Sequence, residues 1–103
     1  MIARVWHGRV PSDKAEAYHA FLVERALPDY AAVPGHRGTW IFLRREGPVA
    51  HVVLTTLWDS REAVARFAGV DPERARYYPE DDGFLLEREP TVTHYEVLPA
   101  EKR

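Results

Sequence analysis

Apolar residues gather in four short stretches whose patterns predict β-strands, at residues 2–10, 39–46, 49–58 and 91–98. The third stretch is the most continuous, because residues 52–58 are β-branched, aliphatic or aromatic almost without interruption. Such a run suits a strand that is covered on both faces. A Glu-Gly-Pro sequence at 46–48 predicts the hairpin turn that joins the second stretch to the third.

Two longer stretches carry the three-to-four-residue spacing of amphipathic helices. The first begins with Ser and Asp at 12–13 and runs to about Leu27. Pro28 then either begins a short second helix or kinks the first, since proline does not fit freely into a helix interior. The second spans residues 60–69, where Asp59 and Ser60 offer side-chain oxygens to the first free N–H groups and a glycine ends the helix.

The connection between this second helix and the last strand contains two further signals. Asp-Pro at 71–72 predicts a short helix that ends before Pro79. The sequence Glu-Asp-Asp-Gly at 80–83 predicts a turn, and consecutive carboxylates beside a glycine are usually solvated, so we expect no metal ion there. The tail at 99–103 is expected to be frayed.

The order strand, helix, strand, strand, helix, strand predicts an α+β fold, the ferredoxin-like split βαβ arrangement with a four-stranded antiparallel sheet. We expect residues 1–98 to form a single domain, since 103 residues suffice for one core.

Two helices can cover only one face of this sheet, yet the strands carry apolar side chains on both faces. Trp40 and Phe42 share one face of their strand, and Ile41 and Leu43 share the other. A second copy of the chain, related by a two-fold axis, is the simplest cover for the open sheet face. The pattern therefore predicts a homodimer that closes into a dimeric α/β barrel.

Composition narrows the classes of function. The formal net charge of −2 argues against nucleic-acid binding by bulk charge, and no apolar run approaches the length of a membrane span. Cysteine is absent, which leaves no disulfide or thiolate chemistry, and we expect a cytoplasmic protein. Asn and Gln are also absent; heat adaptation and a GC-rich genome explain this equally well.

Short motifs carry a resemblance to a known family. Pro28 precedes Pro-Gly at 34–35, and Leu-Trp-Asp-Ser-Arg-Glu-Ala at 57–63 leads to Phe67. With these motifs and the order of elements, nearly the whole chain resembles the antibiotic biosynthesis monooxygenase family of the dimeric α/β-barrel superfamily. The resemblance implies a pocket in each subunit, between the sheet and its own helices. Some members oxidise aromatic compounds with O₂ and no metal or flavin, and others open haem.

The resemblance also provides a test for haem degradation. Haem-opening members use an Asn on the first strand, a Trp near the end of the third and a His on the second helix. Trp58 could match the Trp, and His7 lies near the position of the Asn. The chain has no Asn, and the helix at 60–69 has no His, so two of the three parts are missing.

Three histidines fall on predicted strands, at positions 7, 51 and 94. They could bind one metal ion only if they lay on the same face and at the same level of the sheet. Taking the third strand as parallel to the first, we expect His51 at the far end from His7. We expect His94 beside His7, since the last strand is antiparallel to the first. No metal site is therefore predicted, and His94 or His7 is the candidate base. Glu96 could orient His94 or form a cross-strand ion pair with Arg4.

Four further residues are candidates for contact with a substrate. Tyr18 and Trp58 would form walls of the pocket, although a tryptophan before a helix cap is more often part of the core. Arg76 could anchor a carboxylate or phenolate, and Tyr77 lies beside it near the expected lid. Both could equally hold the long connection in place.

The expected function is that of a small cofactor-independent monooxygenase that acts on an aromatic or quinone-like compound. The alternative is a non-catalytic dimer that binds a small ligand or takes part in a stress response. No phosphate-binding loop, nucleophile elbow or zinc motif is present, so the sequence gives no support for nucleotide, flavin or zinc chemistry.

Overall fold

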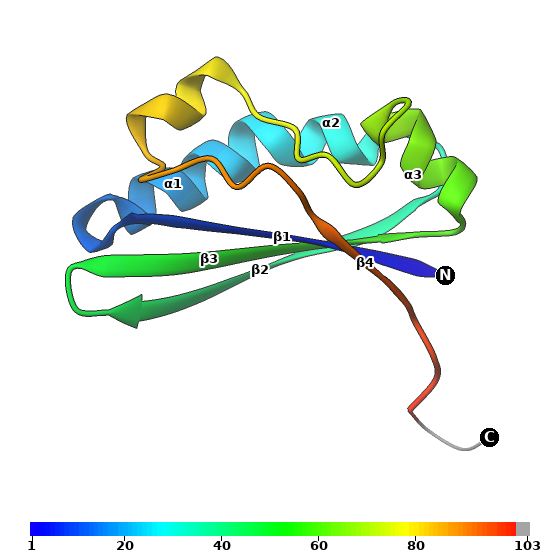
Figure 1. The fold of residues 1–103 in the computed structure, drawn as a ribbon, viewed down its shortest axis with the longest axis horizontal. Helices are drawn as coiled ribbons and strands as arrows, with labels where there is room; N and C mark the ends of the chain where they lie inside the picture. Colours follow the sequence, from blue (N-terminus) through cyan, green and yellow to red (C-terminus); the bar gives the residue numbers. More distant parts are fainter. Residues whose placement is uncertain (101–103) are drawn as a thin grey trace.

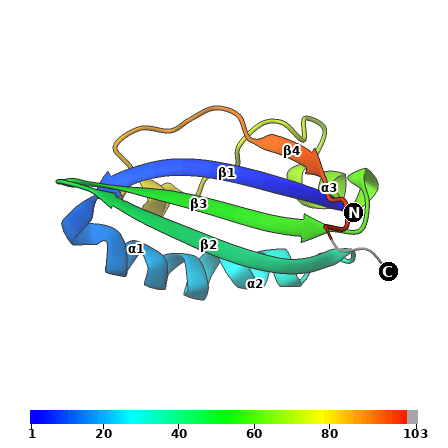
Figure 2. The ribbon, with the colours of Figure 1, turned by 90° about the horizontal axis from the view of Figure 1, so that it is seen from below.

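The computed structural model describes residues 1–100, and its strands form one four-stranded sheet in the order β2-β3-β1-β4 (Figures 1 and 2). All neighbouring strands are antiparallel. The bounds are β1 (Ile2–Pro11), β2 (His36–Glu46), β3 (Val49–Trp58) and β4 (Thr93–Glu96). The predicted α+β ferredoxin-like fold is therefore confirmed. Residues 101–103, the end of the tail expected to be frayed, lie outside the described part of the chain.

The helices lie on one face of the sheet (Figure 1). A 3₁₀ turn (Ser12–Lys14) leads into α1 (Ala15–Phe21), a π-helical segment (Leu22–Ala26) and α2 (Leu27–Ala31). Pro28 thus sits near the start of α2, because the wider π-helical turn before it accommodates a residue that has no N–H to donate. The second predicted helix is α3 (Arg61–Ala68), and the Ser60 hydroxyl caps it by accepting a hydrogen bond from the Ala63 N–H.

The connection from α3 to β4 differs from its prediction. Residues 71–78 form no helix, because the Ala75 N–H bonds to the Pro90 carbonyl and the Val92 N–H to the Glu73 carbonyl. These long-range bonds replace the local ones that a helix would need. The predicted turn at 80–83 belongs to a 3₁₀ helix (Pro79–Gly83). The last strand is shorter than its apolar pattern, since it begins at Thr93.

The strand faces follow the predicted alternation. Even-numbered residues of β1 and β3 face the helices and form the core with them, and Val10, Ala50 and Trp58 are fully buried. The other face, here called the open face, carries Trp40 and Phe42, each about half exposed. Among residues 1–100 nothing covers these side chains, so the second copy expected there remains a prediction. No helix of the described chain is long and apolar enough to cross a membrane.

Candidate functional site

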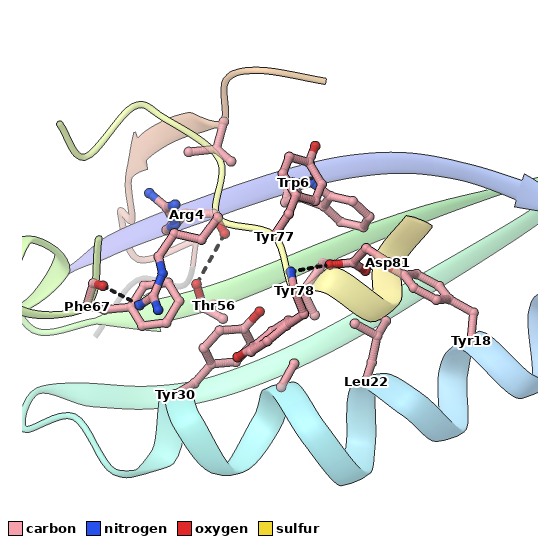
Figure 3. Close-up of a pocket in the computed structure, with 14 residues that line it drawn as sticks. Arg4, Trp6, Tyr18, Leu22, Tyr30, Thr56, Phe67, Tyr77, Tyr78 and Asp81 are labelled. Atoms are coloured by element: carbon pink, nitrogen blue, oxygen red, sulfur yellow. Dashed lines mark hydrogen bonds between the residues drawn. The ribbon is translucent and has the colours of Figure 1, made fainter. Parts of the chain in front are cut away.

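A pocket lies between the helix-covered face of the sheet and the helices (Figure 3). Its lining comes from both central strands, all three helices, the π-helical segment and the connection to β4. The lining residues are Arg4, Trp6, Tyr18, Leu22, Ala26, Tyr30, Leu54, Thr56, Phe67, Arg76, Tyr77, Tyr78, Asp81 and Val92. Figure 3 shows Arg4 and Phe67 toward one end of the pocket and Tyr18 and Asp81 toward the other.

Aromatic side chains form most of the walls. Trp6 projects from β1, and its indole N–H donates to the Tyr77 hydroxyl at 3.1 Å. That hydroxyl donates in turn to the Glu89 carbonyl at 2.5 Å, which fixes the connection against the sheet. Gly8 makes room for the indole, since a Cβ at this position would lie 2.3 Å from the Trp6 ring. The glycine therefore permits a close approach, while the pairing of β1 with β3 continues without a bulge.

Asp81 is a buried carboxylate at one end of the pocket, although its sequence predicts a solvated turn. Only 3% of the residue is exposed. One oxygen accepts a hydrogen bond from the Tyr18 hydroxyl at 2.9 Å, and the other accepts from the Tyr78 N–H at 2.7 Å. Burial raises the pKa of Asp81, more than these hydrogen bonds lower it. A raised pKa makes this carboxylate a stronger base than a solvated aspartate.

Arg4 is a buried cation at the opposite end. Its guanidinium donates hydrogen bonds to the carbonyls of Pro72 and Arg74, and one nitrogen lies 3.4 Å from Nε2 of His94. Burial lowers the pKa of Arg4 to about 10, so the group keeps its charge at neutral pH. It has no salt bridge to a carboxylate within residues 1–100. The expected ion pair with Glu96 is not formed, because Arg4 lies opposite His94 in the sheet.

Arg76 places a second guanidinium at the same end of the pocket. It donates to the Phe67 carbonyl at 2.7 Å, and its guanidinium carbon lies 4.6 Å from the centre of the Phe67 ring. Arg4 contacts the same ring at 5.6 Å. Like Arg4, Arg76 forms no salt bridge with a described carboxylate. Two cations thus flank one aromatic ring and leave several N–H donors for an anion.

The hydroxyl of Tyr30 lies between the two ends and completes the polar lining. It has no hydrogen-bond partner in the described part of the chain, and burial raises the pKa of Tyr30 to about 12. The pocket encloses about 40 Å³, room for no more than a few water molecules. A larger ligand therefore enters only when lining side chains move. Tyr77 and Tyr78 belong to a connection with one short 3₁₀ helix, the least regular part of the wall.

Three of the four predicted substrate contacts line this pocket, namely Tyr18, Arg76 and Tyr77. The fourth, Trp58, is fully buried in the core behind it. Its indole N–H donates to the Thr56 hydroxyl at 2.8 Å, and its ring stacks on Phe67. The roles of all four residues in binding remain predictions.

The two predicted catalytic histidines lie apart. His7 is on the open face and His94 on the helix-covered face, so the expected His7–His94 neighbourhood is wrong. His94 is near the pocket only through Arg4, and burial, with the Arg4 charge, lowers the pKa of His94. The expected place of His51 is also wrong. Strands β1 and β3 are antiparallel, which brings His51 to 3.0 Å from His7.

Sequence reasoning missed Arg4 as an unpaired cation and Asp81 as a buried base. The local signal for Asp81 was the capping position three residues after Tyr78, where an acidic side chain can accept from a backbone N–H. No local signal distinguished Arg4 from other charged residues on strands.

No family model matches the sequence, and no curated protein matches it. Solved structures do. An antibiotic biosynthesis monooxygenase structure has a TM-score of 0.66 at 15% identity and covers 96% of this chain and 100% of its own. NE2512, a protein of unknown function from Nitrosomonas europaea, has a TM-score of 0.65 at 19% identity and covers 99% of this chain and 93% of its own. A MhuD variant with two manganese protoporphyrin IX molecules bound per active site has a TM-score of 0.64 at 16% identity, with full coverage of both chains.

At these identities the likeness concerns the fold, which runs through nearly the whole of each chain. The chain therefore has the ferredoxin-like fold of the antibiotic biosynthesis monooxygenase structures, as its motifs predicted.

Proposed function

We propose that the chain binds a small aromatic anion in this pocket and oxidises it as a cofactor-independent monooxygenase. The observation that carries the proposal is the pair of guanidinium groups, Arg4 and Arg76, which line an aromatic pocket without a carboxylate partner among residues 1–100. Arg4 is buried, and a buried charge without a carboxylate partner is costly, so an anionic ligand would offset that cost. Arg76 is exposed and adds further N–H donors beside it. A phenolate or carboxylate on an aromatic ring fits both the charge and the walls.

The residues present can support such a reaction. Asp81 would take a proton from the substrate, and Arg4 and Arg76 would stabilise the resulting anion. The electron-rich anion would then reduce O₂, with one oxygen atom entering the substrate and the other leaving as water. His94 is a second candidate base, although its Nε2 faces the Arg4 guanidinium at 3.4 Å. A substrate of two or three rings would enter when Tyr77 releases Trp6 and the Glu89 carbonyl, and Tyr78 releases Asp29.

The proposal includes a homodimer formed through the open face. Trp40, Phe42 and Tyr95 each expose about half of their surface on this side of the sheet. The three side chains lie on both edge strands of the sheet, and monomeric soluble proteins seldom expose so much aromatic surface on one face. A two-fold axis would let the same patch cover itself.

Binding is tested with 9-anthracenecarboxylate and its uncharged methyl ester, and quenching of tryptophan fluorescence is the readout. We expect the acid to bind the wild type and Arg76→Met to weaken it at least about tenfold, since a charged hydrogen bond is worth about 1.5–3 kcal/mol. Arg66→Met is the matched control, because Arg66, like Arg76, is exposed and donates to one backbone carbonyl, but it lies outside the pocket. Equal binding of acid and ester would contradict the anion site.

Catalysis is tested by oxygen uptake with an anthrone that carries a phenol group. We expect one O₂ consumed for each quinone formed, and a fall in kcat of at least about a hundredfold in Asp81→Asn. Binding of the aromatic acid without oxygen uptake would favour the alternative, a non-catalytic small-ligand-binding protein. The small enclosed volume and the internal hydrogen bonds of Asp81 favour that alternative.

A further inference from the structure

His7 and His51 form a pair on the open face, on the opposite side of the sheet from the pocket. They are diagonal neighbours, since His7 lies opposite Val53 and His51 opposite Arg9 in the pairing of β1 with β3. Nε2 of His7 lies 3.0 Å from Nδ1 of His51, and the two rings are stacked with centres 5.3 Å apart. The two nitrogens therefore converge on one place.

A carboxylate holds the other nitrogen of each ring. Nδ1 of His7 lies 2.5 Å from a Glu89 oxygen, and Nε2 of His51 lies 3.2 Å from a Glu46 oxygen. A carboxylate accepts hydrogen bonds, so it favours the proton on the nitrogen that faces it. In the neutral rings the proton-free nitrogens, Nε2 of His7 and Nδ1 of His51, then face each other with their lone pairs. Two lone pairs at this distance repel unless a proton or a metal ion lies between them, and either one can take that place.

This is the arrangement that metal-binding histidines adopt, in which the ring nitrogen away from the metal donates to a carboxylate. Two imidazole ligands of one tetrahedral ion are about 3.3 Å apart when each bond is about 2.0–2.1 Å. The observed 3.0 Å between the His7 and His51 nitrogens needs only a small rotation of the rings to reach that separation.

The surroundings leave room for an ion and its water ligands. A hollow of about 280 Å³ lies beside the pair, lined by His7, Phe42, Leu43, Arg44, His51 and Val53. Arg44 lies opposite His51 in the sheet, and its positive charge, which would repel a cation, is paired with Glu46 at 3.2 Å. Arg9 forms a salt bridge with Glu87 at 2.6 Å. Each nearby cation is thus matched by a carboxylate, and Glu89 adds a further negative charge.

We propose that His7 and His51 bind a divalent transition-metal ion through Nε2 and Nδ1, with Glu89 and Glu46 as the residues that orient the rings. Imidazole nitrogen selects Zn²⁺, Ni²⁺ or Cu²⁺, and Cu²⁺ binds most tightly of the three. Within residues 1–100 no cluster of three or more potential ligands exists, so ligands from outside the chain complete the coordination. These are water in a free chain, and water or side chains of the second copy in the proposed homodimer, which would cover this face. Two protein ligands make an exchangeable site rather than a permanent structural one.

The test is a calorimetric titration of the full, tag-free chain with Zn²⁺, Ni²⁺ and Cu²⁺, each in a separate experiment. We expect one ion per chain in the wild type, with Cu²⁺ the tightest, and affinities at least about tenfold weaker in His7→Ala and in His51→Ala. His19→Ala is the matched control, since His19 is an exposed residue of α1 away from this pair. Equal affinities in all four proteins would overturn the proposal.

Two further measurements separate ligation from general surface binding. The Cu²⁺ electron paramagnetic resonance spectrum should show coupling to two imidazole nitrogens, and to fewer in each single variant. Glu89→Gln should weaken binding about tenfold while both histidines remain, as loss of an orienting carboxylate does in other sites. A spectrum identical in wild type and His51→Ala would exclude the pair as ligands. These outcomes are independent of the pocket, which lies on the other face.

Discussion

The hydroxyl of Tyr18 donates a hydrogen bond of 2.9 Å to Asp81, and both residues are almost completely buried. The bond joins α1 to the 3₁₀ helix of the long connection, 63 residues later in the chain. It therefore holds one wall of the pocket closed and also determines the environment of the carboxylate.

Tyr18→Phe should destabilise the fold by about 1–3 kcal/mol at neutral pH, because the Asp81 carboxylate loses a donor that water cannot replace in a buried site. Urea unfolding measures this difference. Tyr95→Phe, on the open face, is the control and should change the free energy of unfolding by less than about 0.5 kcal/mol. Equal stability of Tyr18→Phe and wild type would mean that the bond contributes nothing.

Asp81 should make the fold less stable as the pH rises. Burial raises the pKa of Asp81 above its ordinary value of 3.8, so the folded chain holds this proton more tightly than the unfolded chain. The stabilising contribution is complete below pH 3.8 and is lost as the pH rises through the folded-state pKa. Asp81→Asn removes this dependence. Between pH 4 and pH 8, the free energy of unfolding of the wild type should therefore fall relative to that of Asp81→Asn. A difference between the two proteins that stays the same at every pH would contradict the raised pKa.

His94 should act in the opposite direction. Burial first, and then the charges of Arg4 and Arg61, lower the pKa of His94 below 6.5. The folded chain thus binds this proton less well than the unfolded chain, and stability present above pH 6.5 is lost as the pH falls through the folded-state pKa. His94→Gln should lose less stability between pH 7 and pH 5 than the wild type. His19→Gln should behave like the wild type in the same thermal melts.

The double variant Trp40→Glu and Phe42→Glu should be monomeric. The two side chains expose about half of their surface on the open face, where a dimer would bury them and where a carboxylate could not be buried without a partner. Sedimentation velocity measures the change, and an unaltered circular dichroism spectrum checks the fold. A wild type that is itself monomeric at all concentrations would contradict the dimer.

Local pattern was sufficient for most of the fold. Alternation along 39–46 assigned Trp40 and Phe42 to one face and Ile41 and Leu43 to the other, as the pairing with β3 bears out. It succeeded because side-chain direction in a strand depends only on neighbouring residues. The local pattern failed at 71–78. Asp-Pro favoured a helix there, but the backbone instead forms hydrogen bonds with residues 90–92, which are distant in sequence.

The candidate site divides in the same way. The sequence identified Tyr18, Arg76 and Tyr77 as residues that could reach a pocket, from their positions on a helix face and in a long connection. It could not reveal that Asp81 is buried, because neighbouring Glu80, Asp82 and a glycine mark a solvated turn. Burial depends on what packs over a residue, and Tyr18 does so from the other end of the chain.

The sequence by itself thus determined the four strands and the main helices, their order and the side chains that each strand presents to either face. Only the tertiary structure decided that Arg4 is buried without a counter-ion and that His7 meets His51 rather than His94. Strand direction, desolvation and charge pairing arise from contacts between residues far apart in the chain. Local propensity carries no information about such contacts, although the free energy of a charged group depends mainly on them.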